Sequence, residues 1–181
     1  MNFLATKFKT LLLLALLGGL TFQCEKKEDN QDTVTVAALA AIFSSAGDCT
    51  VNAPPRASIN TFTTAITANG SATITQTGTV PIVAHKNAAL KLTAKNNTAV
   101  AFSGGSASIL VYKSSSCPLS SPTTSGFTTT IASDNSGFTD SFLLSGSGSI
   151  TFTTAGDYYI FIYAQPSKGQ TANLSYTVTN L

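Results

Sequence analysis

Asp157-Tyr158-Tyr159-Ile160-Phe161-Ile162-Tyr163-Ala164 is the stretch that decides the predicted fold, because it carries apolar and aromatic residues at consecutive positions. Successive side chains of a strand point to opposite faces of its sheet, so such a strand is apolar on both faces. Strands of this kind lie in the middle of a sheet. The stretch Ser106 to Tyr112 has the same character. We expect both stretches to be central strands.

Segments on either side of these two stretches alternate between apolar and polar residues, as half-buried strands do. Asn69-Gly70 is a hairpin-turn signal between Thr61 to Thr67 and a partner strand that contains Ala72 and Ile74. The other expected strands are Ala89 to Lys95, Phe127 to Ile131, Phe138 to Leu144, Ser149 to Thr153 and Ala172 to Thr179. Turn chemistry separates several of them, at Asp134-Asn135-Ser136-Gly137 and at Gly146-Ser147-Gly148.

Short strands at spacings of roughly ten residues indicate an all-β fold. We expect two antiparallel sheets packed face to face as a jelly-roll-like β-sandwich, with a closed barrel as the alternative. Residues 33–181 contain 25 Thr and 21 Ser, which favour strands and turns, so composition agrees with this class. The same segment has six basic and four acidic side chains, a net charge of +2 that is too small for a nucleic-acid surface.

The first residues of the chain have the layout of an export signal. Lys7 and Lys9 precede the apolar run Leu11 to Leu20, which is about half the roughly 20 residues that a membrane-spanning helix requires. We expect residues 1–23 to be a cleaved signal peptide, residues 24–32 a charged tether and residues 33–181 a single domain. An ordinary secretory signal, with Cys24 removed or left as an odd thiol, is the alternative.

The sequence Thr21-Phe22-Gln23-Cys24 resembles the lipobox of bacterial lipoproteins, including those of spirochaetes. The resemblance implies that Cys24 becomes the lipid-modified first residue of the mature chain. The membrane is then a partner through this anchor, and several acyl chains together hold a protein firmly. The protein is expected at a bacterial membrane, in particular an outer membrane, on its periplasmic side or at the cell surface.

Two further features follow the tether. Val34 to Ser45 is Ala-rich with an apolar stripe, which predicts a short N-terminal helix, although a strand through Val34 and Val36 is the alternative. Cys49 and Cys117 form an even pair in an exported chain and are predicted to be joined in a disulfide. Two buried thiols, or a bridge to an unlipidated Cys24, are the alternatives.

The last half of the chain, from Ser106 to Thr179, resembles the bacterial pre-peptidase C-terminal domain, a small secreted β-sandwich. The matching pieces are Ile109-Leu110-Val111-Tyr112, Ile150-Thr151-Phe152 before Ala155-Gly156-Asp157-Tyr158-Tyr159-Ile160, and Leu174-Ser175-Tyr176-Thr177-Val178. The resemblance implies the sandwich fold.

No arrangement of residues indicates catalysis or a metal centre, and we predict a protein that is not an enzyme and has no cofactor. His85 is the one histidine, too little evidence for a Ser-His-Asp site, and the supply of zinc ligands is inadequate. Asp134, Asn135 and Asp140 are a weak calcium candidate, with a hairpin turn as the alternative.

Tyr159, Phe161 and Tyr163 share one face of their strand and are the candidate binding face. Exposed, they could stack on sugar rings or grip a protein; packing against a second sheet is the alternative. We therefore expect a lipid-anchored binding or adhesion module with a glycan or protein ligand and no nucleic-acid partner. A structural or shielding surface lipoprotein and an accessory subunit of a secreted hydrolase are the alternatives.

Overall fold

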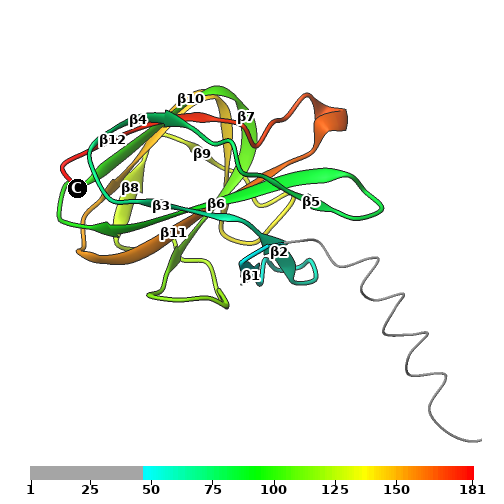
Figure 1. Ribbon diagram of the computed structural model, residues 1–181, viewed down its shortest axis with the longest axis horizontal. Helices are drawn as coiled ribbons and strands as arrows, with labels where there is room; N and C mark the ends of the chain where they lie inside the picture. Colours follow the sequence, from blue (N-terminus) through cyan, green and yellow to red (C-terminus); the bar gives the residue numbers. More distant parts are fainter. Residues whose placement is uncertain (1–46) are drawn as a thin grey trace, which may run out of the picture. The chain divides into compact units, whose positions relative to one another are not determined.

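The computed structural model describes residues 47–181, which form an all-β fold (Figure 1). One short 3₁₀ helix, η1 (Pro166–Lys168), is the helical element of this part of the chain. The strands are β1 (Cys49–Val51), β2 (Ile59–Thr61), β3 (Thr63–Ile66), β4 (Gly70–Thr73), β5 (Gly78–Val80), β6 (His85–Ala94), β7 (Ala99–Lys113), β8 (Phe127–Thr129), β9 (Ala132–Ser133), β10 (Ser141–Phe152), β11 (Gly156–Ala164) and β12 (Ser175–Thr179). The predicted helix at Val34 to Ser45, the signal peptide, Cys24 and the tether lie outside the described residues.

The strands make a sandwich-like arrangement because two long strands take part in both of its layers. The second half of β7 pairs with β11, which continues through β6 to β3, whereas the first half of β7 pairs with β12, which continues to β4. β10 pairs with β7 along nearly its whole length and carries β8 and β9 on its other edge. Figure 1 shows β4 and β12 along one side of the molecule and β3, β6 and β11 along another.

The two long strands bend where they cross between layers. The register of the β7–β10 pair shifts between Gly146 and Ser147, and Gly104 on the opposing strand has a φ of +89°. Gly146 has a φ of +82°, a backbone conformation that other residues adopt only with strain. Glycine at a bulge therefore lets one strand pair serve both sheets. The prediction of a turn at Gly146-Ser147-Gly148, separating two strands, is wrong.

The predicted hairpin around Asn69-Gly70 is also wrong, because its two arms join different layers. β3 pairs with β6, and the pairing is parallel, so the fold is not antiparallel throughout. β4 pairs with β12 in the other layer. Each arm finds its hydrogen bonds with a strand distant in sequence, which a local turn signal does not reveal.

The main core lies between the layers. It contains Leu90 and Leu92 of β6, Ile160 and Ile162 of β11, and residues from all the longer strands. The inward alternation predicted for Leu90, Leu92 and Ala94 is confirmed, with all three buried. The two stretches predicted to be central strands are confirmed, since β11 lies between β6 and β7 and β7 lies between β11 and β10.

A second core lies on the outer face of β7 and β11 and explains why these strands are apolar on both faces. Leu110 and Tyr112 of β7 pack there with residues of the β1–β2 segment and with Leu119 and Phe138 from the loops. We call the segment 48–61 together with residues 117–119 the cover. Asn52 N donates to Leu119 O at 2.7 Å and Leu119 N donates to Thr50 O at 2.9 Å, so the two parts of the cover are paired by backbone hydrogen bonds.

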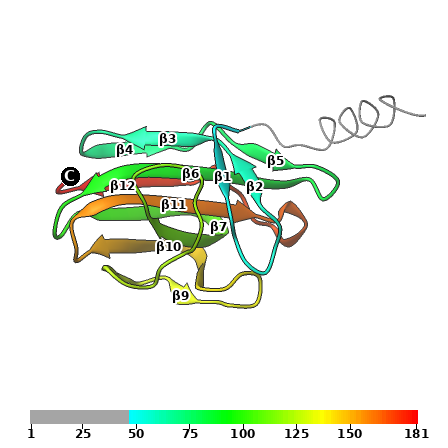
Figure 2. The same cartoon turned by 90° about the horizontal axis from the view of Figure 1, so that it is seen from below.

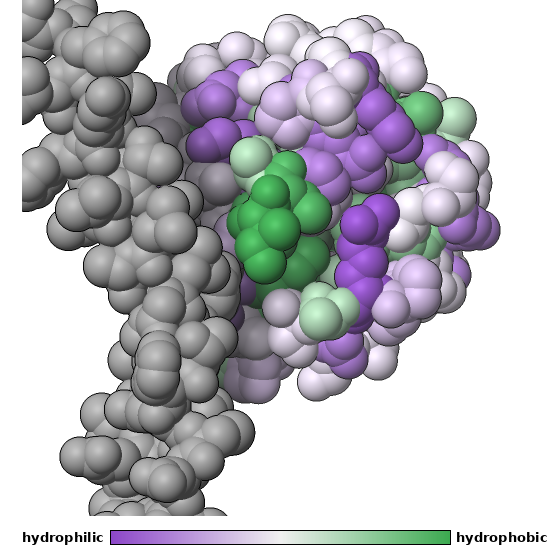
Figure 3. All heavy atoms as spheres, turned by 90° about the vertical axis from the view of Figure 1, so that its right-hand side faces the viewer, coloured by the Kyte–Doolittle hydropathy of each residue, from purple (hydrophilic) through white to green (hydrophobic). Residues whose placement is uncertain are grey.

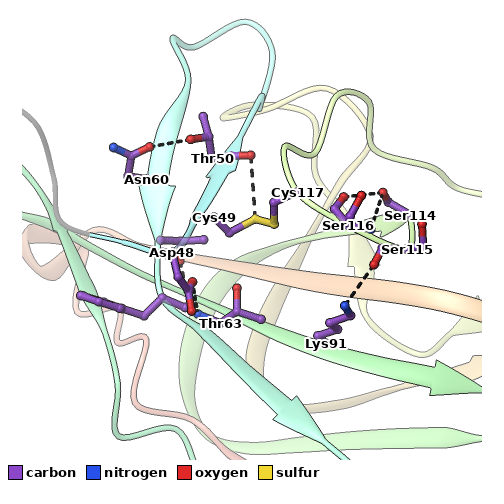
Figure 4. The surroundings of a disulfide bond; sticks show 12 residues. Asp48, Cys49, Thr50, Asn60, Thr63, Lys91, Ser114, Ser115, Ser116 and Cys117 are labelled. Atoms are coloured by element: carbon purple, nitrogen blue, oxygen red, sulfur yellow. Dashed lines mark hydrogen bonds between the residues drawn. A yellow bond between two sulfur atoms is a disulfide. The ribbon is translucent and has the colours of Figure 1, made fainter.

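The predicted disulfide between Cys49 and Cys117 is confirmed and joins the same two parts of the cover (Figure 4). Lys91 of β6 donates from Nζ to Ser115 O at 3.0 Å, beside the disulfide. Thr63 N donates to the Asp48 carboxylate at 2.8 Å, which fastens the start of the described chain to β3. The covalent bond thus joins the two parts of the cover, and polar contacts with β3 and β6 fasten its edges to the sheet.

Candidate functional site

The aromatic row predicted as a candidate binding face is not exposed. Tyr159, Phe161 and Tyr163 are 3%, 0% and 2% accessible to solvent, because the cover lies over them. Phe138 contacts Tyr163 with ring centroids 4.9 Å apart, in an edge-to-face arrangement. These rings pack in the second core, so the alternative to an exposed binding face, packing against another layer, describes them. No sugar or protein can reach them on the folded protein.

The calcium candidates are used within their own turn. Ser136 N donates to the Asp134 carboxylate at 2.9 Å, the pattern of an Asx turn. Hydrogen bonding from Ser136 is the largest cause of a lowered pKa of Asp134. Ser141 N donates to Asn135 Oδ1 at 3.4 Å, while Asp140 adopts a positive φ of 56° in the loop that leads into β10. Residues 47–181 contain no group of three or more His, Cys, Asp or Glu side chains that could hold a metal ion.

His85 begins β6 and contacts the hydroxyl of Tyr163, with Nδ1 and Oη 2.5 Å apart. Burial raises the pKa of Tyr163, so its hydroxyl stays protonated and can donate to Nδ1. The pKa of His85 is lowered, first by burial and then by the nearby charges of Arg56 and Lys168. This lowered pKa favours the neutral form of His85 at pH 7. Its partner is the buried phenol of Tyr163, and this contact ties the start of β6 to β11.

Arg56 covers the outer side of this pair. Its guanidinium lies 4.8 Å from the centroid of the Phe138 ring and 5.4 Å from that of Tyr163, and its Nε donates to Gly137 O at 3.2 Å. Such cation–π contacts hold a charged group at a defined place on a surface. The cover thus presents a fixed positive charge close to His85.

The surface feature that sequence reasoning missed lies directly before His85. β5 and β6 form an antiparallel hairpin, and its turn consists of Pro81, Ile82, Val83 and Ala84, which we call the hairpin tip. Ile82 is 87% exposed and Val83 is 49% exposed, and they are the exposed large hydrophobic residues of the described chain. The signal that could have found the hairpin tip is an apolar triplet, Pro81-Ile82-Val83, where turns normally carry polar residues.

The backbone of the hairpin tip is strained at Ile82. Val83 N donates to Pro81 O at 2.8 Å, which closes a γ-turn around Ile82, and Ile82 has a φ of 71°. A positive φ is a genuine outlier for a β-branched residue, at a cost on the order of 1–3 kcal/mol. Ala84 also has a positive φ, of 54°. The chain therefore holds an apolar side chain out in solvent although this conformation carries a cost.

The hairpin tip lies at one end of the sandwich, together with η1, on the right-hand side of Figures 1 and 2. Basic residues occur around it: Lys86 follows His85 in β6 and donates to Thr79 Oγ1 at 2.7 Å, and Arg56 and Lys168 lie within electrostatic reach of His85. Figure 3, which looks onto this end, shows a compact hydrophobic patch bordered by hydrophilic residues. This patch with its basic surroundings is the candidate functional site.

Comparisons with known proteins give no match: no protein family, no curated protein and no solved structure is similar to the chain. The resemblance to the pre-peptidase C-terminal domain thus stays a prediction from sequence, as does the lipobox. Within residues 47–181, no helix is long and apolar enough to cross a membrane.

Proposed function

We propose that this protein is an exported, lipid-anchored, non-enzymatic binding module of a bacterial envelope, and that its contact element is the hairpin tip. The observation that carries the proposal is the exposure of Ile82 on a strained turn, since an apolar side chain held in solvent at an energetic cost marks a contact site. The candidate row at Tyr159, Phe161 and Tyr163 no longer supports a glycan ligand, because it is buried.

The disulfide supports the exported location. Bonds between cysteines form and persist in oxidising compartments and are rare in the cytosol. The Cys49–Cys117 bond joins segments 68 residues apart and closes the cover over the second core. The apolar run before Cys24 provides the route of export, and lipidation of Cys24 provides the anchor.

A structural or shielding lipoprotein is the second candidate, and one observation favours it. Apart from the hairpin tip, the large apolar side chains of the described chain are at least partly covered, and serines and threonines are frequent on the outer faces. A coat protein without a ligand needs no more than this. The exposure of Ile82 favours the binding module over a coat protein without a ligand.

Protease shaving of intact cells, combined with fatty-acid labelling, tests the proposal. The wild-type protein should carry the label and be removed by external protease or, on the periplasmic side, only after the outer membrane is opened. The Cys24→Ala variant should carry no label. Labelling that persists in Cys24→Ala, or a protein found in the cytosol with reduced Cys49 and Cys117, would contradict the proposal.

A further inference from the structure

We propose that the hairpin tip inserts into the headgroup region of an anionic lipid bilayer and holds this end of the sandwich against the membrane. The inference rests on the proposed function, of which it names the ligand. Three properties of the site support it: its small convex shape, the charge of its neighbours and the conformation of its backbone.

The size of the patch favours a lipid surface over a protein partner. A stable protein–protein interface buries more than about 1,000 Å² in total and uses roughly 20–30 residues on each side. The hairpin tip offers two large exposed apolar side chains, Ile82 and Val83, on a projecting turn. A bilayer makes no demand for shape complementarity, and its interface accepts apolar side chains to a depth of about 5–10 Å.

The neighbouring charges favour lipids with negative headgroups. Lys86 lies at the base of the hairpin tip, and both Arg56 and Lys168 lie close enough to lower the pKa of His85. Asp134 is an opposing charge, because Lys168 lies close enough to contribute to the lowered pKa of its carboxyl. Apolar residues at an apex with basic residues behind them are the pattern of interfacial membrane binding, in which each Lys or Arg near the surface adds attraction to anionic lipids.

The backbone conformation keeps Ile82 exposed before any contact is made. The γ-turn bond from Val83 N to Pro81 O fixes the turn, and the contact of His85 with Tyr163 fixes the strand that follows. Little ordering is then needed on insertion, so most of the gain from burying the side chain is kept.

A single tryptophan can report the position of the hairpin tip, because the chain contains no Trp. In the full chain, Val83→Trp places the reporter at the tip and leaves Ile82 in place. Asn96→Trp is the matched control, since Asn96 is exposed in the turn at the opposite end of β6. Both variants are purified from membranes and reconstituted in vesicles of phosphatidylcholine with phosphatidylglycerol, with or without brominated acyl chains as quenchers.

On vesicles, the indole of the Val83→Trp variant should emit at shorter wavelength and be quenched by the brominated lipid, while the indole of Asn96→Trp remains unquenched. Adding Ile82→Ser to Val83→Trp should lower the insertion equilibrium by roughly tenfold to a hundredfold, the gain from burying one large aliphatic side chain. Adding Lys86→Gln should lower it by about fivefold in anionic vesicles and leave it unchanged in pure phosphatidylcholine.

An indole that stays in water when the Val83→Trp variant is on vesicles would overturn the inference. Shielding of this indole without vesicles, in proportion to protein concentration, would assign the hairpin tip to self-association and also overturn it. Shielding on intact cells combined with no quenching in vesicles would overturn it in favour of an envelope protein as the partner. The fatty-acid label reports whether Cys24 is lipidated, and the indole of Val83→Trp reports whether the hairpin tip lies in the bilayer. The proposed function and this inference can therefore fail separately.

Discussion

Loss of the Cys49–Cys117 bond should lower the free energy of unfolding of the described domain by about 4 kcal/mol. In the chain-entropy model, a cross-link stabilises a fold by restricting the unfolded chain, and the effect grows with the length of the closed loop. The two cysteines are 68 residues apart, for which the model gives an entropy loss of about 15 cal/mol/K in the unfolded state. At 298 K this entropy corresponds to about 4 kcal/mol.

Urea unfolding followed by circular dichroism measures this effect. The full chain carrying Cys24→Ala, which removes the third thiol, is compared with the same chain carrying Cys49→Ala and Cys117→Ala in addition. The urea midpoint of the second form should be lower by roughly 2 M, taking an ordinary slope for a domain of this size. A reductant should lower the midpoint of the first form to that of the second and leave the second unchanged.

A loss of less than about 1 kcal/mol would refute this reasoning. It would mean that the cover opens freely without unfolding the sandwich, so that the bond restrains no part of the cooperative unit. The backbone bonds between Leu119 and Thr50 argue against such independent opening, because they pair the two parts of the cover directly.

Three further changes test individual contacts, each by urea unfolding of the variant. Phe161→Ala should lower the free energy of unfolding by about 3–5 kcal/mol, because this ring is fully buried beneath the cover, whereas Phe62→Ala, which removes a partly exposed ring, should lower it clearly less. Similar losses in the two variants would contradict the existence of the second core. Asn87→Leu should leave the free energy of unfolding unchanged or raise it by about 1–2 kcal/mol, because the buried side-chain amide of Asn87 has no hydrogen-bond partner within residues 47–181. A decrease of about 1–2 kcal/mol would show that the amide does have a hydrogen-bond partner. The pKa of His85 is lowered in the folded protein, so the unfolded chain binds this proton more readily and the free energy of unfolding should fall as the pH drops through 6.5 and below; His85→Gln should weaken this fall. The lowered pKa of Asp134 acts only below about pH 4, so a pH profile that His85→Gln leaves unchanged between pH 7 and 5 would contradict the assignment to His85.

Much of the fold could be predicted from the sequence because the decisive information is local. The consecutive apolar residues from Tyr158 to Ala164 indicate that both faces of their strand are buried, although they do not indicate which segments cover the two faces. The disulfide could also be predicted, because two cysteines remain after Cys24 in a chain that begins with the layout of an export signal, and cysteines of exported proteins pair. The identity of the covering layer could not be predicted, because it consists of short segments between residues 48 and 61 and around Leu119 with little periodicity of their own.

Strand partners were predicted less well because pairing is a long-range property. A glycine such as Gly146 occurs both at a hairpin turn and at a bulge within a bent strand. The two cases are distinguished only by the pairing with β7, which continues on both sides of Gly146. Likewise, the chain bends just before Gly70, but the strands on either side of the bend pair in different layers, β3 with β6 and β4 with β12.

The candidate site shows the same limit. Alternation placed Tyr159, Phe161 and Tyr163 on one face correctly, but it does not state whether that face meets solvent or another layer. The exposure of the hairpin tip could not be predicted, because the apolar triplet before Ala84 is short and lies in a loop. The exposure of a loop residue depends on the neighbouring loops as much as on the residue itself.

We propose that the chain lies outside the cytoplasm and is held there by Cys24, its first mature residue. Intact mass spectrometry of the protein purified from membranes without reductant tests this claim most directly. The purified chain should begin at Cys24, carry acyl groups on that residue and lack two hydrogens because Cys49 and Cys117 are joined. A chain that still begins at Met1, with no acyl group and three free thiols, would contradict it.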